Sequence, residues 1–88
     1  MMDNVMSKEL QIESEVATDL VSNKLSDEAY HRAAEKIATN FSPAEEQQVE
    51  NQIAQMVKGE SHGQLTLNTQ ELFADVLEVR CKNVHPIQ

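Results

Sequence analysis

The sequence predicts an all-α protein of four helices, and three observations support this fold class. Apolar residues recur at helical intervals of three and four in four separate segments. Serine or asparagine, which cap helix N-termini, precede several of these segments. The two glycines and two prolines fall near segment ends. We expect helices over roughly 4–24, 27–41, 43–58 and 69–82. At 88 residues the chain is too short for two domains, so 1–88 is expected to form a single acidic helical domain.

The first expected helix has two acids where apolar residues should lie. Its apolar side chains cover about half of the helix circumference, and Glu9 and Glu13 fall near the middle of that arc. Because burying an unpaired carboxylate is costly, both acids need an explanation. Three explanations are open. The acids are solvated because the first turns project beyond the core, or they pair with a cation, or they belong to a face that docks a partner.

Arg80 is the candidate cation for these acids. It falls within the apolar arc of the last expected helix, and a guanidinium group can donate to two carboxylate oxygens at once. We therefore expect Arg80 to form a buried ion pair with Glu9 or Glu13, either within one chain or across a dimer interface.

The second and third expected helices have the clearest end signals. Ser26 is a plausible N-cap for the second helix, whose apolar side has Tyr30, Ala33, Ala34, Ile37, Ala38 and Phe41. In the third, Ser42 is the expected N-cap, Pro43 occupies the first helical position and Glu45 completes a capping box. Gly59 is the expected stop. The apolar stripe of the third helix is narrow, so this helix should lie on the outside of the domain.

The last segment is ambiguous between helix and strand. The pattern "NTQE" at 68–71 favours a capped helix. Residues 64–68 and 77–82, however, alternate apolar and polar side chains with a period of two. A short strand pair is therefore a possible alternative there.

The charge of the chain excludes some functions and suggests others. Fifteen acidic residues against seven basic ones give a formal net charge of −8. We expect no direct nucleic-acid binding, because that requires a cationic face. The single cysteine favours a reducing, cytoplasmic setting, and the N-terminal residues resemble neither a signal peptide nor a membrane span. No membrane association is expected.

Catalytic and metal-binding signatures are weak. No glycine-rich phosphate loop or nucleophile motif occurs, so we expect no enzyme activity and no cofactor. Cys81 and His85 would share one face of a helix and could serve as metal ligands or in catalysis, but the paired spacing that makes such predictions strong is missing.

These features together predict a small regulator or inhibitor that binds another protein with a basic surface, and that forms a homodimer. Apolar residues of the first helix, Met6, Leu10 and Val16, would provide affinity. The acids Glu45, Glu46 and Glu50 would govern the association rate. One alternative is a nucleic-acid mimic that occupies the basic groove of a DNA- or RNA-binding protein. The other is a metal-binding or catalytic protein that uses Cys81 and His85.

Overall fold

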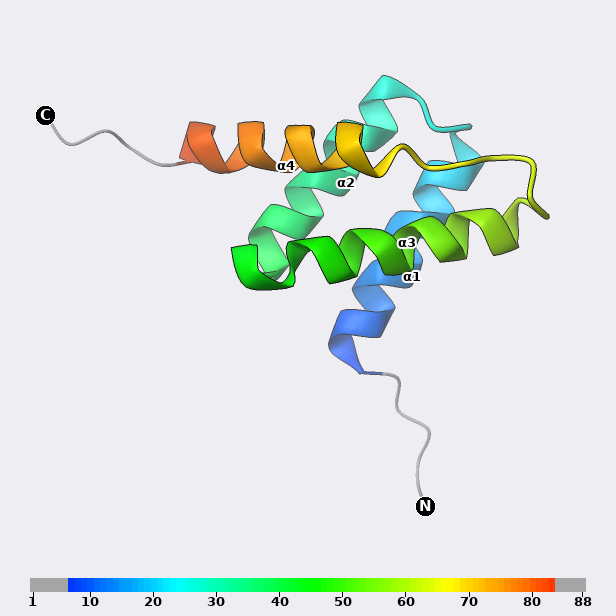
Figure 1. Cartoon of the computed structure of the whole chain (residues 1–88), viewed down its shortest axis with the longest axis horizontal. Coiled ribbons are helices and arrows are strands. Elements are labelled where there is room, and N and C mark those ends of the chain that lie inside the picture. Colours follow the sequence, from blue (N-terminus) through cyan, green and yellow to red (C-terminus); the bar gives the residue numbers. More distant parts are fainter. Residues whose placement is uncertain (1–6, 84–88) are drawn as a thin grey trace, which may run out of the picture.

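The computed structural model describes residues 7–83, which form four α-helices in two layers (Figure 1). The helices are α1 (Lys8–Ser22), α2 (Asp27–Asn40), α3 (Glu46–Glu60) and α4 (Thr69–Asn83), and a 3₁₀ turn, η1 (Pro43–Glu45), precedes α3. In Figure 1, α3 and α4 run in opposite directions in front of α1 and α2. The most extensive packing joins α2 to α4 and α1 to α3. The predicted all-α class is confirmed.

The possible strand pair is wrong, because the described part of the chain contains no strand. Residues 64–68 form the connection before α4, and 77–82 lie within α4. Leu72, Val76 and Val79 are all buried, and only a helix places residues at these intervals on one side. Phe73 and Leu77, the large apolar residues of α4 that lie off this spacing, are both exposed.

Side-chain caps precede α2 and the 3₁₀ turn η1, whereas α3 begins three residues later than predicted, at Glu46, without a side-chain cap. The hydroxyl of Ser26 accepts a hydrogen bond from the Ala29 N–H at 3.2 Å, which confirms it as the N-cap of α2. At the next corner, the Glu45 carboxylate accepts from the Ser42 N–H at 2.9 Å. Polar groups left open by the first turn are thereby satisfied.

The predicted helix stop at Gly59 is wrong. Helix α3 continues through Gly59 to Glu60, and His62 adopts the left-handed conformation that ends it, with φ 56°. The Gly63 N–H donates to the Lys58 carbonyl at 2.7 Å, and the His62 N–H donates to the Gly59 carbonyl at 3.1 Å. This pair of bonds is a Schellman motif, so a non-glycine residue occupies the position where glycine is commonest.

One hydrophobic core joins all four helices. Its largest fully buried side chains are Leu20, Ile37, Ile53, Leu72, Val57 and Val76. Tyr30 is also buried, and its hydroxyl accepts a hydrogen bond of 2.9 Å from the backbone N–H of Asn68, just before α4. This bond fixes the start of α4 against α2.

None of the helices within 7–83 has the length and apolarity needed to cross a bilayer.

Candidate functional site

Arg80 forms a partly buried ion pair, but with a different acid from those predicted. Its Nε donates to Oε2 of Glu46 at the start of α3, and its Nη2 donates to the Phe41 carbonyl at 2.9 Å. Within one chain, the predicted pairing with Glu9 or Glu13 is therefore wrong. The reason is the packing order: α4 lies against α2 and α3, whereas those two acids lie on α1. A pairing across a dimer interface stays a prediction.

The two acids of α1 have different surroundings. Glu9 is exposed, as expected for a solvated first turn, whereas Glu13 is only 6% exposed. Burial and the nearby charge of Glu9 raise the pKa of Glu13. Both acids line a cavity of about 230 Å³ between α1 and α3, with Phe41, Glu45, Gln48, Val49 and Gln52. Amide side chains and solvent, rather than Arg80, surround this pair of acids.

Glu50 lies one turn after Glu46 on α3 and, among residues 7–83, forms no ion pair. Both side chains are only 3% exposed. Among residues 7–83, the Oε2 atom of Glu50 is buried and has no hydrogen-bond partner. Burial and the nearby charge of Glu46 raise the pKa of Glu50 from 4.5 to about 7. A buried, unpaired acid with a pKa near neutrality is a feature of functional sites more than of stable cores.

Glu50 also lines a cavity of about 280 Å³ between α3 and the first turns of α4, which we call the Glu50 cavity. Its other lining residues are Gln47, Asn51, Thr69, Gln70 and Phe73. Phe73 is 42% exposed, and Leu77, one turn further along α4, is 44% exposed. The cavity thus combines one ionisable carboxyl, three side-chain amides, a hydroxyl and an aromatic ring.

The remaining predicted contact residues lie elsewhere or are covered. Val16 is 3% exposed and belongs to the core, so its predicted contact with a partner is wrong. Leu10 is exposed, whereas Met6 lies outside the described residues. Of the three acids predicted to present a charged surface, only Glu45 is exposed; Glu46 and Glu50 are buried by α3 packing against its neighbours.

The spacing of the third helix contains a signal that would have located the buried acids. Glu46, Glu50, Ile53 and Val57 follow one another at intervals of four, three and four, which puts them on one helix face. Ile53 and Val57 are in the core, and the two acids continue the same face toward the N-terminus. The exposure of Phe73 and Leu77 has no such signal, because these two residues are four positions apart and form a second apolar stripe next to the buried one.

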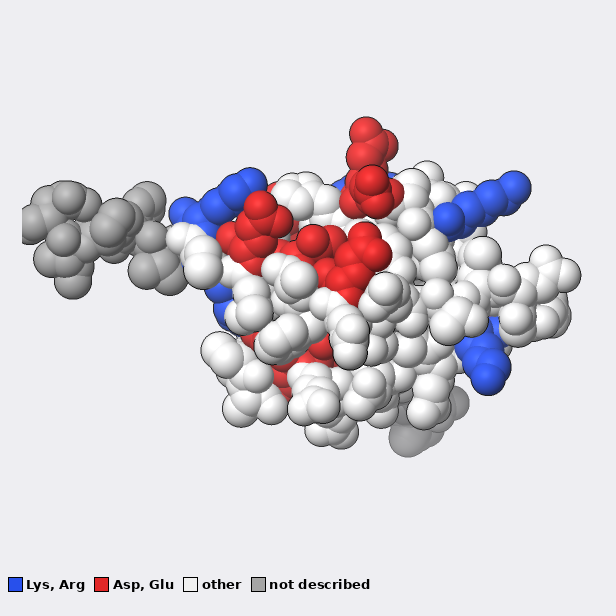
Figure 2. Space-filling model, turned by 45° about the horizontal axis from the view of Figure 1, so that its top comes forward, with Lys and Arg blue, Asp and Glu red and all other residues white. Residues whose placement is uncertain are grey.

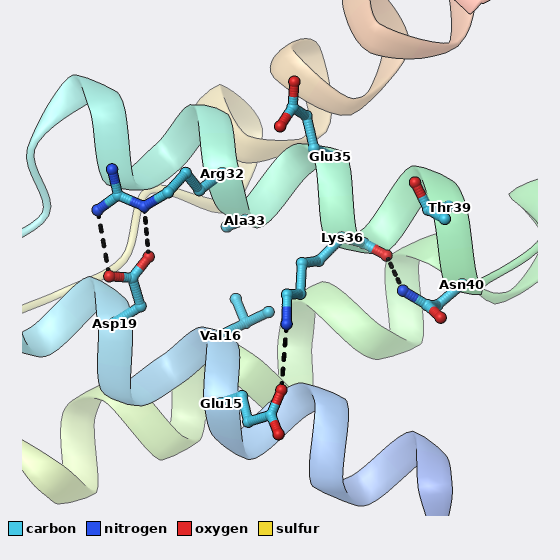
Figure 3. A pocket seen from close by; sticks show the side chains of 9 residues that line it. All are labelled: Glu15, Val16, Asp19, Arg32, Ala33, Glu35, Lys36, Thr39 and Asn40. Atoms are coloured by element: carbon cyan, nitrogen blue, oxygen red, sulfur yellow. Dashed lines mark hydrogen bonds and ion pairs between the residues drawn. The ribbon is translucent and has the colours of Figure 1, made fainter.

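A cavity of about 570 Å³ lies between α1 and α2 and is crossed by two ion pairs (Figure 3). Arg32 donates to both carboxylate oxygens of Asp19, at 3.0 and 3.1 Å, and Lys36 Nζ lies 3.1 Å from Glu15. Figure 3 shows both pairs bridging the helices beside Val16. Its cations already have partners within the chain, and its charged side chains are largely exposed. A ligand would therefore find fewer unpaired polar groups in this cavity than in the Glu50 cavity.

Acidic side chains gather over α2 and α4 (Figure 2). We define the α2–α4 acidic patch as Asp27 of α2 with Glu71, Asp75 and Glu78 of α4. The pKa of Asp75 is raised, first by burial and second by the charge of Glu78. The charge of His31 lowers this pKa, and the charge of Asp27 raises it further. The patch is thus a local concentration of negative charge that a basic partner would relieve.

The structure describes only one of the two residues of the predicted alternative, a metal or catalytic site at Cys81 and His85. Cys81 is exposed on α4, and His85 lies outside the described residues. Within 7–83, no group of three or more histidine, cysteine or acidic side chains is arranged to hold a metal ion.

Comparisons of the chain with protein-family models, with curated proteins and with solved structures found no match.

Proposed function

We propose that this protein is a non-catalytic acidic regulator or inhibitor that binds a basic protein through the surface formed by α3 and α4. One observation supports this proposal above the others: within 7–83, the buried Glu50 carboxyl has an oxygen without a hydrogen-bond partner and shares a cavity with the exposed ring of Phe73. Leu77, which is also exposed, follows one turn later on α4. Aromatic side chains are enriched at the centre of protein interfaces, so the exposed ring of Phe73 favours this surface.

The charge distribution supports a basic partner. The net charge of −8 and the α2–α4 acidic patch both favour encounter with a cationic surface. Such charges act mainly on the association rate, whereas Phe73 and Leu77 would slow dissociation by burying apolar area. The proposed surface thus replaces the predicted combination of the apolar edge of α1 with the acids Glu45, Glu46 and Glu50, but keeps the predicted class of partner.

Affinity capture from a native extract with paired variants tests this function. We expect Phe73→Ser combined with Leu77→Ser to release a basic protein that the parent chain retains. Measured by calorimetry with the purified partner, the loss should be about 2 kcal/mol or more, roughly 30-fold in Kd. Leu10→Ser is the matched control, because it removes an exposed apolar side chain from α1. The proposal fails if no basic protein is retained, or if both variants retain it equally.

Nucleic-acid mimicry is a second candidate, favoured by the α2–α4 acidic patch. A mimic would engage its partner through charge, so Asp75→Lys combined with Glu78→Lys should abolish binding, and added salt should weaken it steeply. Binding through Phe73 and Leu77 would respond much less to both changes. The predicted homodimer and cytoplasmic location stay predictions, and sedimentation of the purified chain tests the first.

A further inference from the structure

We propose that the Glu50 cavity binds a single guanidinium or ammonium group, which an Arg or Lys side chain of the partner protein supplies. The protein source of this cation rests on the proposed function. The preference of the cavity for a cation rests on the geometry of α3 and α4.

Within 7–83, no basic side chain forms an ion pair with Glu50. Arg80 donates to Glu46 and to the carbonyls of Ala38 and Phe41. Arg32 and Lys36 are engaged with acids of α1. Among the described residues, the Glu50 Oε2 atom therefore has neither a cation nor a hydrogen-bond donor. A buried carboxylate in this state is stabilised strongly by a cation that arrives from outside.

The other cavity residues suit an organic cation. The amide oxygens of Gln47, Asn51 and Gln70 and the Thr69 hydroxyl can accept N–H groups, and the ring of Phe73 can lie against a cation. A volume of about 280 Å³ is at the low end for small-molecule sites, and fits the head of one side chain. A divalent metal fits less well, because within 7–83 no cluster of three ligating side chains surrounds Glu50.

The surroundings of the cavity favour a protein as the source. Phe73, which lines the cavity, and Leu77, one turn further along α4, are both exposed, and a free amine would leave this apolar area uncovered. A second copy of the chain is disfavoured as the occupant, because two molecules that each carry a charge of −8 repel one another. A basic side chain flanked by apolar residues could pair with the Glu50 carboxyl while its apolar neighbours cover Phe73 and Leu77.

Binding of a cation must be coupled to loss of a proton from Glu50. Its pKa of about 7 means that the carboxyl is partly protonated at neutral pH, and a cation favours the ionised form. The charged groups that bear on Glu50 are Glu46 on α3 and, through it, Arg80 on α4; the other lining residues are neutral. Affinity should therefore rise about tenfold from pH 6 to pH 8 and change little above that.

The test uses N-acetyl-arginine amide as the probe and its neutral analogue N-acetyl-citrulline amide as the control ligand, titrated into the full chain by NMR. We expect the arginine probe, and not the citrulline probe, to shift the Glu50 carboxyl and Phe73 ring signals, with a Kd on the order of millimolar. Glu50→Gln should weaken binding at least about tenfold, whereas Glu45→Gln, which removes an exposed acid of the same region, should leave it unchanged. Backbone spectra of both variants confirm that they remain folded.

Three outcomes would overturn parts of the proposal separately. Equal binding of the two probes, or equal binding by Glu50→Gln, would overturn the cation site itself. A Leu-Arg-Leu peptide that binds no tighter than the amide probe would overturn the protein source, because contact with Phe73 and Leu77 should add affinity. Self-association abolished by Glu50→Gln would assign the cation to a second copy instead. If the site binds arginine but no basic protein is captured, the proposed function fails and the cation site stands.

Discussion

Glu46 and Glu50 lie one turn apart on α3 and are equally buried, yet their surroundings differ. Arg80 and the start of α3 provide Glu46 with a cation and a favourable helix N-terminus. Glu50 has an unsatisfied oxygen, and the neighbouring charge that raises its pKa is another acid, Glu46. The comparison teaches that burial alone does not determine the state of an acid in this small domain. The countercharge supplied by a neighbouring helix does.

This difference also separates stability from function along a single helix. The Arg80–Glu46 pair ties α4 to α3 and to the end of α2, so it belongs to the framework. The unpaired carboxyl opposes folding when ionised, and such strain is commonly retained where a ligand relieves it. The predictions below test the two ends of this comparison, from the largest expected effect to the smallest.

Removing Arg80 should have the largest effect. Arg80→Met keeps the apolar stem but leaves Glu46 buried without its cation, and also frees the Phe41 carbonyl. We expect a loss of about 3 kcal/mol in the free energy of unfolding, measured by urea denaturation at pH 7.5. Lys36→Met is the matched control, because it breaks an exposed ion pair with Glu15, and it should shift the urea midpoint far less. Equal midpoints for the two variants would contradict the framework role of Arg80.

Glu50→Gln should change how stability depends on pH. In the unfolded chain this acid loses its proton near pH 4.5, whereas in the folded chain it does so near pH 7. The folded state therefore binds the proton more tightly, and the contribution of Glu50 to stability falls as pH rises from 4.5 through 7, then levels off.

The size of that fall sets the expected result. At each pH, the free energy of unfolding of the parent is subtracted from that of Glu50→Gln. We expect this difference to be about 2 kcal/mol more favourable to the variant at pH 8 than at pH 5. Urea titrations at the two pH values measure it, with Glu45→Gln as the exposed control. A constant difference between Glu50→Gln and the parent at both pH values would argue against an unpaired buried acid.

The neutral hydrogen bond between α2 and the start of α4 should contribute least. Tyr30→Phe leaves the Asn68 N–H without the hydroxyl that it contacts at 2.9 Å. We expect a loss of about 1 kcal/mol, without a change in its size between pH 5 and pH 8. Thermal unfolding at both pH values checks this. A pH-dependent loss would mean that the tyrosine acts through the nearby acids rather than through this bond.

The fold was largely predictable because helix starts are local. Ser26 and Ser42 each stand directly before an apolar pattern, and their hydrogen bonds involve residues within one turn. The end of α3 was not predictable in this way, since Gly59 satisfies the usual pattern for a stop while the Schellman bonds form at His62 and Gly63.

The candidate site was only partly predictable because it depends on which helices meet. The position of Arg80 within an apolar arc correctly indicated that it would need an acid, but four helices can pack in more than one order. Its partner became identifiable only once α4 was placed against α2 and α3. The isolation of Glu50 likewise follows from where Arg80 goes, which no local pattern records.

The most direct test of the account is the titration of the Glu50 side chain itself. Carbon-13 NMR of the carboxyl carbon in the intact chain, followed from pH 3 to pH 9 and assigned with Glu50→Gln, should show a transition near pH 7. A transition near 4.5 would mean that the carboxylate is solvated or already paired, and would contradict the central claim that α3 holds a buried acid awaiting a cation.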